Sequence, residues 1–450
     1  TWKSSYDVLI DVWTKAQGDG VNVPKIAFML PFGPVDWSLV SLRQLYEDIY
    51  KPGRAENLWF YLHGKPCIMA YPDNLTDSPE DRTIRDFFTF RPGQPDIVDG
   101  PGRPDQWGWL ETYPQHKFVE RPDGGCEASG GHCCAFNAPG TYGRSYTQQR
   151  GQDTREDAYL YGLNIQEQWD YALQCDPDLI FVTGWNEFIA GKHIGWHPAR
   201  PYYPFAFPDQ FDWERSRDIE PVKAWGDKGD AYYIQLVDNI RRYKGVSESQ
   251  AVSQPRSFRI GRFDGWDGVS PDFRHYPGNT MHRNHKGHAN MFYTNTTGRN
   301  DIVDAKVARD RRYVYFYVET ADKLTPSTDR NWMMLFIDVD RDKATGWEGY
   351  DFVLNYEKPQ DGKSVLSRHS GDGWNWERAA EADYAVDGNR MEIRIPRSLL
   401  GEFGKSLNIE FKWSDNMQEE GNIMDFYVNG DAAPGGRFNF VYDERAGQNR

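Results

Sequence analysis

Apolar and polar residues follow two alternating patterns in the first half of the chain. Some segments repeat apolar residues every three to four positions, which is typical of helices that cover a sheet. These segments lie at about 5–17, 36–50, 80–87, 155–175 and 230–243. Short runs of β-forming residues separate them, as expected for βα units built around a parallel sheet. The pattern therefore predicts an α/β domain over residues 1–245.

The short runs predict the strands of this domain. They lie at 24–30, 66–71, 88–91, 107–111 and 179–187. The last run is continuously apolar, which is typical of a strand buried on both faces, until it ends in Trp-Asn-Glu. Because a (β/α)8 barrel needs eight strands, we expect this chain to carry the later units of such a barrel, with its first strands upstream of Thr1. A complete but smaller α/β domain is the alternative.

The pattern changes after residue 258. Residues 246–258 are polar and rich in Ser and Gln, as in a linker. Beyond them, segments of period two follow one another with few helical patterns between them. These segments lie at 311–319, 333–338, 390–396 and 407–413. We expect residues 259–450 to form an antiparallel β-sandwich, so the predicted fold class is α/β plus all-β.

Charge and composition narrow the class of partner. The net charge of −15 argues against nucleic acid and against anionic membrane surfaces, since both bind basic patches. The sequence holds no apolar stretch of the about 18 residues that a transmembrane helix needs. Aromatic residues make up 15% of the chain, and such side chains stack on sugar rings as well as filling cores. Carbohydrate is therefore the partner that the composition favours.

Two of the predicted strands end in glutamate, at Glu111 and at Glu187. In a barrel, the C-terminal ends of the strands carry the active site. Hydrolysis of a glycosidic bond needs two carboxyl groups that flank the bond, one as general acid and the other as base or nucleophile. Glu187 and Glu111 are therefore the predicted catalytic pair. The structural alternative is that each glutamate caps a helix or pairs with Arg91.

Residues beside these glutamates are suited to bind a sugar. Asn186 would hydrogen-bond a sugar hydroxyl or orient Glu187. Trp185, Trp109 and Trp107 would supply apolar walls that stack on sugar rings and raise the pKa of one glutamate.

Other polar residues follow predicted strands and would lie at the same edge. The predicted substrate contacts among them are Tyr71, Asp73, Arg91 and His193. A later loop adds Glu214, Asp218 and Glu220, which we expect to contact substrate or to form salt bridges within the loop.

Three of the five cysteines lie in one Gly-rich segment, Cys126-Glu-Ala-Ser-Gly-Gly-His132-Cys133-Cys134. We expect a disulfide from Cys126 to Cys133 or Cys134, because a flexible Gly-rich loop gains most stability from a covalent cross-link. A disulfide would indicate an oxidising location, hence a secreted, periplasmic or cell-surface protein. Zinc held by these cysteines and His132 is the alternative.

Three segments of the first domain together resemble a known enzyme clan. They are His63-Gly-Lys-Pro66 before a strand, the Trp-Gly-Trp strand at 107–109, and Thr183-Gly-Trp-Asn-Glu-Phe-Ile-Ala-Gly191. They resemble the barrel glycoside hydrolases that include endo-α-1,2-mannosidases. The resemblance implies that Glu187 is catalytic. The clan's second catalytic glutamate falls three residues later, where this chain has Ala190, so Glu111 is taken as the partner from its strand-end position.

The second domain also carries a family resemblance. The segment Leu335-Phe-Ile-Asp338-Val-Asp340-Arg-Asp342, continued to residue 351, resembles the family 9 carbohydrate-binding modules. Asp338, Asp340 and Asp342 alternate as in a calcium loop, because carboxylates are hard ligands for a hard cation. Aspartates that cap a strand-end turn are the alternative. Several tryptophans of this domain are candidates for a sugar platform or for the core, namely Trp332, Trp347, Trp374 and Trp376.

Taken together, the sequence predicts an exported glycoside hydrolase with a carbohydrate-binding-like domain. Its substrate would be a polysaccharide or complex glycan, it would need no cofactor for catalysis, and calcium would be structural. A glycan-binding protein without activity is the first alternative, and a metal-dependent enzyme that uses the cysteine loop is the second.

Overall fold

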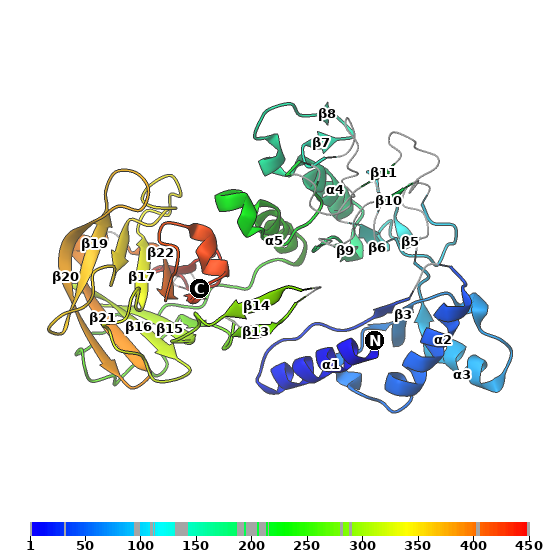
Figure 1. Ribbon diagram of the computed structural model, residues 1–450, viewed down its shortest axis with the longest axis horizontal. Helices are drawn as coiled ribbons and strands as arrows, with labels where there is room; N and C mark the ends of the chain where they lie inside the picture. Colours follow the sequence, from blue (N-terminus) through cyan, green and yellow to red (C-terminus); the bar gives the residue numbers. More distant parts are fainter. Residues whose placement is uncertain are drawn as a thin grey trace. The chain divides into compact units, whose positions relative to one another are not determined.

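The computed structural model divides into two compact units, Thr1–Gly245 and Val246–Arg450, each of which is described by itself (Figure 1). The structure describes residues 2–30, 33–93, 100–108, 111, 113–130, 143–186, 193–194, 205–206, 213–214, 216–279, 282–287, 290–401 and 406–447.

The first sheet of unit 1 holds three parallel strands. They are β1 (Phe28–Met29), β3 (Lys65–Met69) and β4 (Thr89–Phe90), and β2 (Tyr61–Leu62) pairs with β3 as an antiparallel hairpin.

Three helices pack with this sheet. They are α1 (Trp2–Gly18), α2 (Asp36–Leu45), which continues as a π-helical turn to Tyr50, and α3 (Pro79–Phe87). Ser78 is the N-cap residue of α3, and its side chain accepts a hydrogen bond from the backbone N–H of Asp81. Apolar residues of all three helices share one core cluster with Ile68 of β3 and with Ala70, which directly follows that strand.

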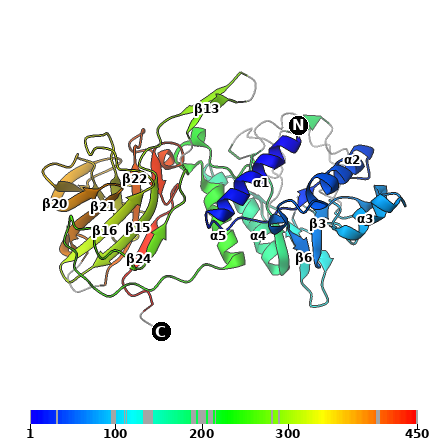
Figure 2. The ribbon, with the colours of Figure 1, turned by 90° about the horizontal axis from the view of Figure 1, so that it is seen from below.

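A second sheet of unit 1 holds β5 (Phe118–Glu120), β6 (Cys126–Gly130) and β9 (Pro177–Phe181). Strands β6 and β9 are parallel. Helices α4 (Leu163–Gln174) and α5 (Ala231–Lys244) lie side by side (Figure 2). Their apolar residues pack together with Ile180 of β9.

The two sheets also share a core, which is formed by the faces that the helices do not cover. Cys67 and Met69 of β3 pack with Trp107, with Ala128 of β6 and with Phe181 of β9. Unit 1 is therefore an α/β unit with parallel strands, and small two-stranded pairs complete it: β7 (Tyr146–Thr147) with β8 (Gly151–Gln152), and β10 (His193–Ile194) with β11 (Phe205–Ala206).

The predicted helices of unit 1 are confirmed, but three predictions about its strands are wrong. Of the strand expected at 107–111, the described residues show only an isolated bridge from Trp107 to Gly93, and Glu111 lies outside any strand. The strand expected at 179–187 runs only from Pro177 to Phe181, and its apolar residues Leu179, Ile180 and Phe181 are half-buried instead of buried on both faces. The segment taken as a Gly-rich loop contains the fully buried strand β6. The small residues Ala128, Ser129 and Gly130 suggested a loop. Small side chains also suit a strand that neighbouring parts of the backbone approach closely.

Unit 2 is built on one antiparallel sheet of eleven strands, whose order along its main path is β12-β15-β16-β21-β20-β19-β18-β17-β22-β23, with β24 beside β22. The strand bounds are β12 (Asp272–Arg274), β15 (Ile302–Arg309), β16 (Tyr313–Thr320), β17 (Met334–Asp338), β18 (Phe352–Leu354), β19 (Lys363–His369), β20 (Trp376–Asp387), β21 (Arg390–Pro396), β22 (Asn408–Asp415), β23 (Asp431–Ala433) and β24 (Phe440–Asp443). The strands predicted from period two are confirmed in β16, β17, β21 and β22.

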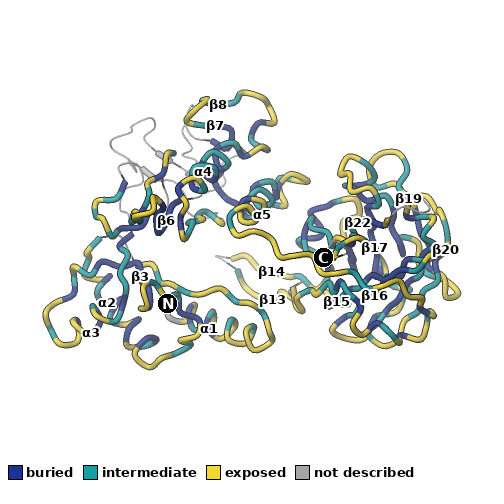
Figure 3. The backbone as a smooth tube through the Cα atoms, turned by 180° about the vertical axis from the view of Figure 1, so that it is seen from behind, coloured by how far each residue is buried: buried dark blue, intermediate teal, exposed yellow. Residues whose placement is uncertain are grey.

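The sheet of unit 2 encloses the largest apolar core (Figure 3). Alternate residues such as Val314, Phe316 and Val318 of β16 point into it, as period two requires. The two ends of the strand path approach each other, because a carboxylate oxygen of Asp431 in β23 accepts the backbone N–H of Ile302 in β15 at 2.6 Å. A separate hairpin of β13 (Arg283–Lys286) and β14 (Phe292–Asn295) belongs to the same unit.

Candidate functional site

The chain that leaves β9 is tied to a second segment of unit 1. The backbone N–H of Ile219 donates to the Gly184 carbonyl at 3.0 Å, and that of Glu220 donates to the Trp185 carbonyl at 2.8 Å. Trp185 is 49% exposed, with its ring edge-on to Tyr233.

Asn186, the next residue, is exposed and contacts a carboxylate of that second segment. Its Nδ2 donates to Glu220 Oε2 at 2.6 Å. An aromatic face and a half-buried carboxylate therefore stand beside the position where the chain continues to Glu187. Glu187 and Trp109 lie outside the described residues, and so does the side chain of His193, whose backbone belongs to β10.

A buried arginine positions the segment that carries Glu220. Arg144 is 3% exposed, and its guanidinium donates to the carbonyls of Ser216 at 3.0 Å and Asp218 at 2.9 Å. The same guanidinium lies 3.7 Å from the centroid of the Tyr232 ring of α5, a cation–π contact. Burial lowers the pKa of Arg144. These contacts fix the backbone immediately before Glu220 against the helices of the unit.

Glu111 is engaged in a local structural contact. Its side chain is 2% exposed, and its Oε2 accepts the backbone N–H of His116 at 2.8 Å. Its Oε1 lies 2.8 Å from His116 Nδ1. The imidazole in turn packs on Gly100, where an added Cβ would lie 2.4 Å from His116 Cε1. The structural alternative therefore accounts for this carboxylate, although its partner is His116 and not Arg91.

Arg91 and Trp107, both predicted to contact substrate, instead bind a carboxylate that the sequence analysis missed. Glu127 of β6 accepts Arg91 Nε on Oε2 at 2.7 Å and Arg91 Nη2 on Oε1 at 2.8 Å. His63 Nε2 lies 2.7 Å from Oε1, and Trp107 Nε1 donates to Oε2 at 3.2 Å. Burial opposes the charge of Glu127, but the bonds from Arg91 and His63 outweigh it and lower its pKa.

Tyr71 and Asp73 join two loops that follow β3 and β4. The Tyr71 hydroxyl donates to the Gly93 carbonyl at 2.6 Å, and Gln106 Nε2 donates to that hydroxyl at 2.9 Å. Arg103 forms an ion pair with Asp73 and lies over the Tyr71 ring. Gln106 and Arg103 were not predicted, because neither follows a recognisable strand in the sequence.

The acidic segment of unit 2 brings together three aspartates, but not the predicted three. Carboxylate oxygens of Asp338, Asp340 and Asp351 lie within 4.8 Å of one another. Asp351 takes the place predicted for Asp342, whose carboxylate accepts the backbone N–H of Ala344 at 2.9 Å. Strand pairing of β17 with β18 places Asp351 there, since its backbone N–H donates to Ile337.

These aspartates also make turn contacts and an ion pair. Asp338 Oδ1 accepts the backbone N–H of Arg341 at 2.5 Å, and Asp351 Oδ2 accepts that of Val339 at 2.9 Å. Lys343 Nζ donates to the other oxygen of Asp338 at 2.7 Å. Burial raises the pKa of Asp338 and of Asp351 against these stabilising bonds. The aspartates therefore cap the turn, as the alternative interpretation expected, and they do so with the same carboxylates that would bind a cation.

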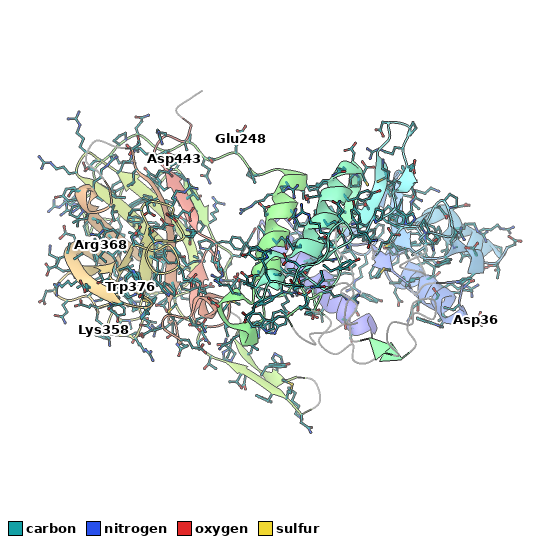
Figure 4. The ribbon with its side chains drawn as sticks, turned by 90° about the horizontal axis from the view of Figure 1, so that it is seen from above. Asp36, Glu248, Lys358, Arg368, Trp376 and Asp443 are labelled. Carbon is teal, nitrogen blue, oxygen red and sulfur yellow. The ribbon has the colours of Figure 1, made fainter. Side chains whose placement is uncertain are left out.

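Three of the four candidate platform tryptophans are core residues. Trp332, Trp347 and Trp376 are at most 8% exposed, whereas Trp374 is half-buried. Trp376 lies on β20, and Figure 4 labels it with Arg368 of the neighbouring strand β19. Only Trp374 of this set offers a partly open ring.

The disulfide predicted from Cys126 is wrong. Cys126 is a free, fully buried thiol at the start of β6, and burial raises its pKa to about 11. Cys67 and Cys175 are buried free thiols, as predicted. His132, Cys133 and Cys134 lie outside the described residues. The exported location stays a prediction that no longer rests on a bond from Cys126.

Comparison with protein-family models, with curated proteins and with solved structures finds no match for this chain. Among the described residues, no helix combines the length and the apolar character needed to cross a membrane.

Proposed function

We propose that the chain is a glycoside hydrolase whose active site lies where the chain leaves β9. In this proposal, unit 1 carries the later units of a (β/α)8 barrel and unit 2 is a carbohydrate-binding-like β-sandwich. The observation that carries it is the hydrogen bond from Asn186 to Glu220 beside the exposed ring of Trp185. The sequence adds Glu187 directly after Asn186, so the proposed site combines the Glu220 carboxylate and the Trp185 ring with a second glutamate that follows a parallel strand in the chain.

The proposed catalytic pair is Glu187 with Glu220 in place of Glu111. Both oxygens of Glu111 contact His116 and its side chain is closed to ligand, whereas Glu220 is half-buried beside Asn186. One glutamate would protonate the glycosidic oxygen, and the other would act as base or nucleophile on the opposite side of the sugar. Trp185 would stack on a sugar ring.

Four glutamine variants test this pair on a panel of aryl α- and β-glycosides and of polysaccharides, with release of aryl alcohol or reducing ends as readout. Glu187→Gln and Glu220→Gln should each lower kcat by about 10²- to 10⁴-fold with the fold intact, because each removes a proton-transfer or nucleophilic group. Glu111→Gln and the exposed control Glu156→Gln should change kcat by less than about threefold, as expected of groups outside the reaction.

Two results would overturn the assignment. Loss of turnover in Glu111→Gln, with Glu220→Gln fully active, would restore Glu111 as the partner. Wild-type rates in all four variants would remove the proposed site altogether.

A glycan-binding protein without activity is the second candidate function. The observation that favours it is Ala190, because the resembling clan has its second catalytic carboxylate at that position. Wild-type protein that is retarded in gels containing a polysaccharide, yet releases no reducing ends from the same polymer, would establish this alternative.

We also propose that Asp338, Asp340 and Asp351 bind calcium, with the Lys343 ammonium displaced from Asp338. Closely spaced carboxylate oxygens suit this cation. Saturating calcium should raise the Tm of unit 2 by about 3 °C over protein in chelator, because a ligand stabilises the state that binds it. Asp351→Asn should abolish the rise, and the exposed control Asp372→Asn should retain it. An equal Tm with calcium and with chelator would remove the proposed site.

A further inference from the structure

Helix α4 of unit 1 has a groove on the side that faces away from the sheet. Its buried residues, including Ile165 and Trp169, pack toward the core. The opposite stripe would ordinarily face solvent, but the segment 147–155 covers it and leaves a cavity of about 590 Å³. The helical side of this cavity is formed by Leu163, Gln166, Glu167, Asp170, Tyr171 and Gln174.

The covering segment is held in place by hydrogen bonds that it forms with side chains of the helix. The two carboxylate oxygens of Glu167 accept the backbone N–H groups of Gln148 and Gln149 at 2.8 and 3.2 Å. Asn164 Nδ2 donates to the Tyr146 carbonyl at 3.0 Å. The groove is therefore preformed, and its walls need no rearrangement to receive a ligand.

The walls carry hydrogen-bonding groups that the protein itself leaves unused. Among the described residues, the guanidinium of Arg150 and the amide of Gln174 make no hydrogen bond, and both side chains are exposed. Asp170 accepts Gln166 and Arg242 on Oδ1 only. Free donors and a free acceptor oxygen thus line the cavity beside its apolar groups.

Two tyrosines add aromatic surface to the same cavity. Tyr113 and Tyr171 both line it, with their rings edge to face at 5.5 Å between centroids. Gln149 Nε2 donates to the Tyr113 hydroxyl at 3.1 Å, which ties that ring to the covering segment. Aromatic faces and polar side chains together suit a ligand that has both apolar C–H faces and many hydroxyls.

We propose that this groove is a binding site for a neutral oligosaccharide or polysaccharide segment, separate from the end of β9. Adjacent hydroxyls of a sugar both donate and accept, so they pair with a guanidinium, an amide and a carboxylate at once. The walls carry both signs of charge, Arg150 and Arg155 with Asp153, Glu167 and Asp170, which disfavours a polyanion. The class of ligand rests on the proposed function, whereas the groove does not.

Native affinity electrophoresis in gels that contain mannan, xylan, soluble starch or polygalacturonate tests the site. We expect at least one of the three neutral polymers to retard wild-type protein. The double variant Arg150→Ala/Gln174→Ala should bind that polymer about tenfold more weakly, as expected for the loss of two hydrogen-bonding side chains. Arg82→Ala, which removes an exposed arginine from helix α3, should bind as the wild type does.

The outcomes separate this inference from the proposed hydrolysis. Equal retardation of wild type and double variant, no retardation by any neutral polymer, or retardation by polygalacturonate alone would each overturn the groove. The double variant should keep the wild-type kcat on small aryl glycosides. Retardation that the double variant loses, in a protein that hydrolyses no glycan, would support the groove while the proposed hydrolase activity fails.

Discussion

Each unit buries an ionisable side chain, Glu127 in unit 1 and Lys412 in unit 2, but the two side chains have different polar partners. Glu127 of unit 1 accepts hydrogen bonds from two nitrogens of Arg91, it contacts His63 and Trp107, and its pKa is lowered. Lys412 of unit 2 is fully buried with the Pro434 carbonyl and the ring of Phe426, and burial lowers its pKa well below the ordinary value.

The difference lies in the number and charge of the partners. A carboxylate surrounded by donors stays ionised inside the protein, whereas burial drives the Lys412 ammonium toward its neutral form although the Asp431 carboxylate opposes this shift. Burial alone therefore does not decide the protonation state of a group. Substitutions that remove or replace these partners should affect the two units differently.

The largest effect is expected from Arg91→Ala. It leaves Glu127 buried without its main partner and should lower the free energy of unfolding of unit 1 by about 3–5 kcal/mol. Urea unfolding monitored by tryptophan fluorescence measures this loss. Arg91→Ala combined with Glu127→Leu should recover part of it, because no charge then remains buried. A loss below about 1 kcal/mol would contradict the view that unit 1 depends on this pair.

A smaller effect of opposite sign is expected from Lys412→Met. Replacing the buried amine by an apolar group of similar size should raise the stability of unit 2 by about 2 kcal/mol at pH 7. Because the folded pKa is depressed, the wild type should gain stability as the pH rises from 7 toward 10, and the variant should not. Lys412→Arg is the contrasting control, since a guanidinium cannot lose its proton and should destabilise. A pH-independent difference between wild type and Lys412→Met would show that Lys412 is charged in the fold.

Asp304 of unit 2 offers a weaker test of the same idea. Burial, together with the neighbouring carboxyl of Asp272, raises the pKa of Asp304 to about 7 despite Lys306 nearby. The folded chain then holds a proton that the unfolded chain releases near pH 4, so stability should fall as the pH rises from 4 to 7. Asp304→Asn should reduce this fall by about 1 kcal/mol, measured as Tm across that range. An unchanged pH profile would show that Asp304 is ionised throughout.

The smallest effect is expected from His63→Ala. The imidazole contacts Glu127, but its side chain is 63% exposed, so solvent screens the pair. The variant should lose only about 0.5 kcal/mol of unit 1 stability, because Arg91 still holds the carboxylate. A loss as large as that of Arg91→Ala would assign the stabilising role to the histidine.

The sequence predicted those parts of the fold that a local pattern specifies. The 3.6-residue period located α5, and the alternation of Val314, Phe316 and Val318 located β16. Strand β6 escaped detection because small residues follow its glutamate and no alternation marks it.

The candidate site was less predictable because its contacts are distant in the chain. Arg91 and Glu127 are 36 positions apart, and Asn186 and Glu220 are 34 apart, so no local pattern connects them. The pairing of Glu111 with His116 spans five residues and was open to inference from the sequence. Asp351 replaced Asp342 because strand pairing, and not sequence spacing, brings it to Asp338.

The near-closure of the sheet in unit 2 bears on its behaviour at high concentration. The terminal strands of its path, β12 and β23, are three residues long each, and Asp431 of β23 bonds the backbone of β15. Short and occupied edges leave few free N–H and C=O groups to accept a strand from another molecule. The eleven-stranded sheet of unit 2 should therefore resist edge-to-edge aggregation.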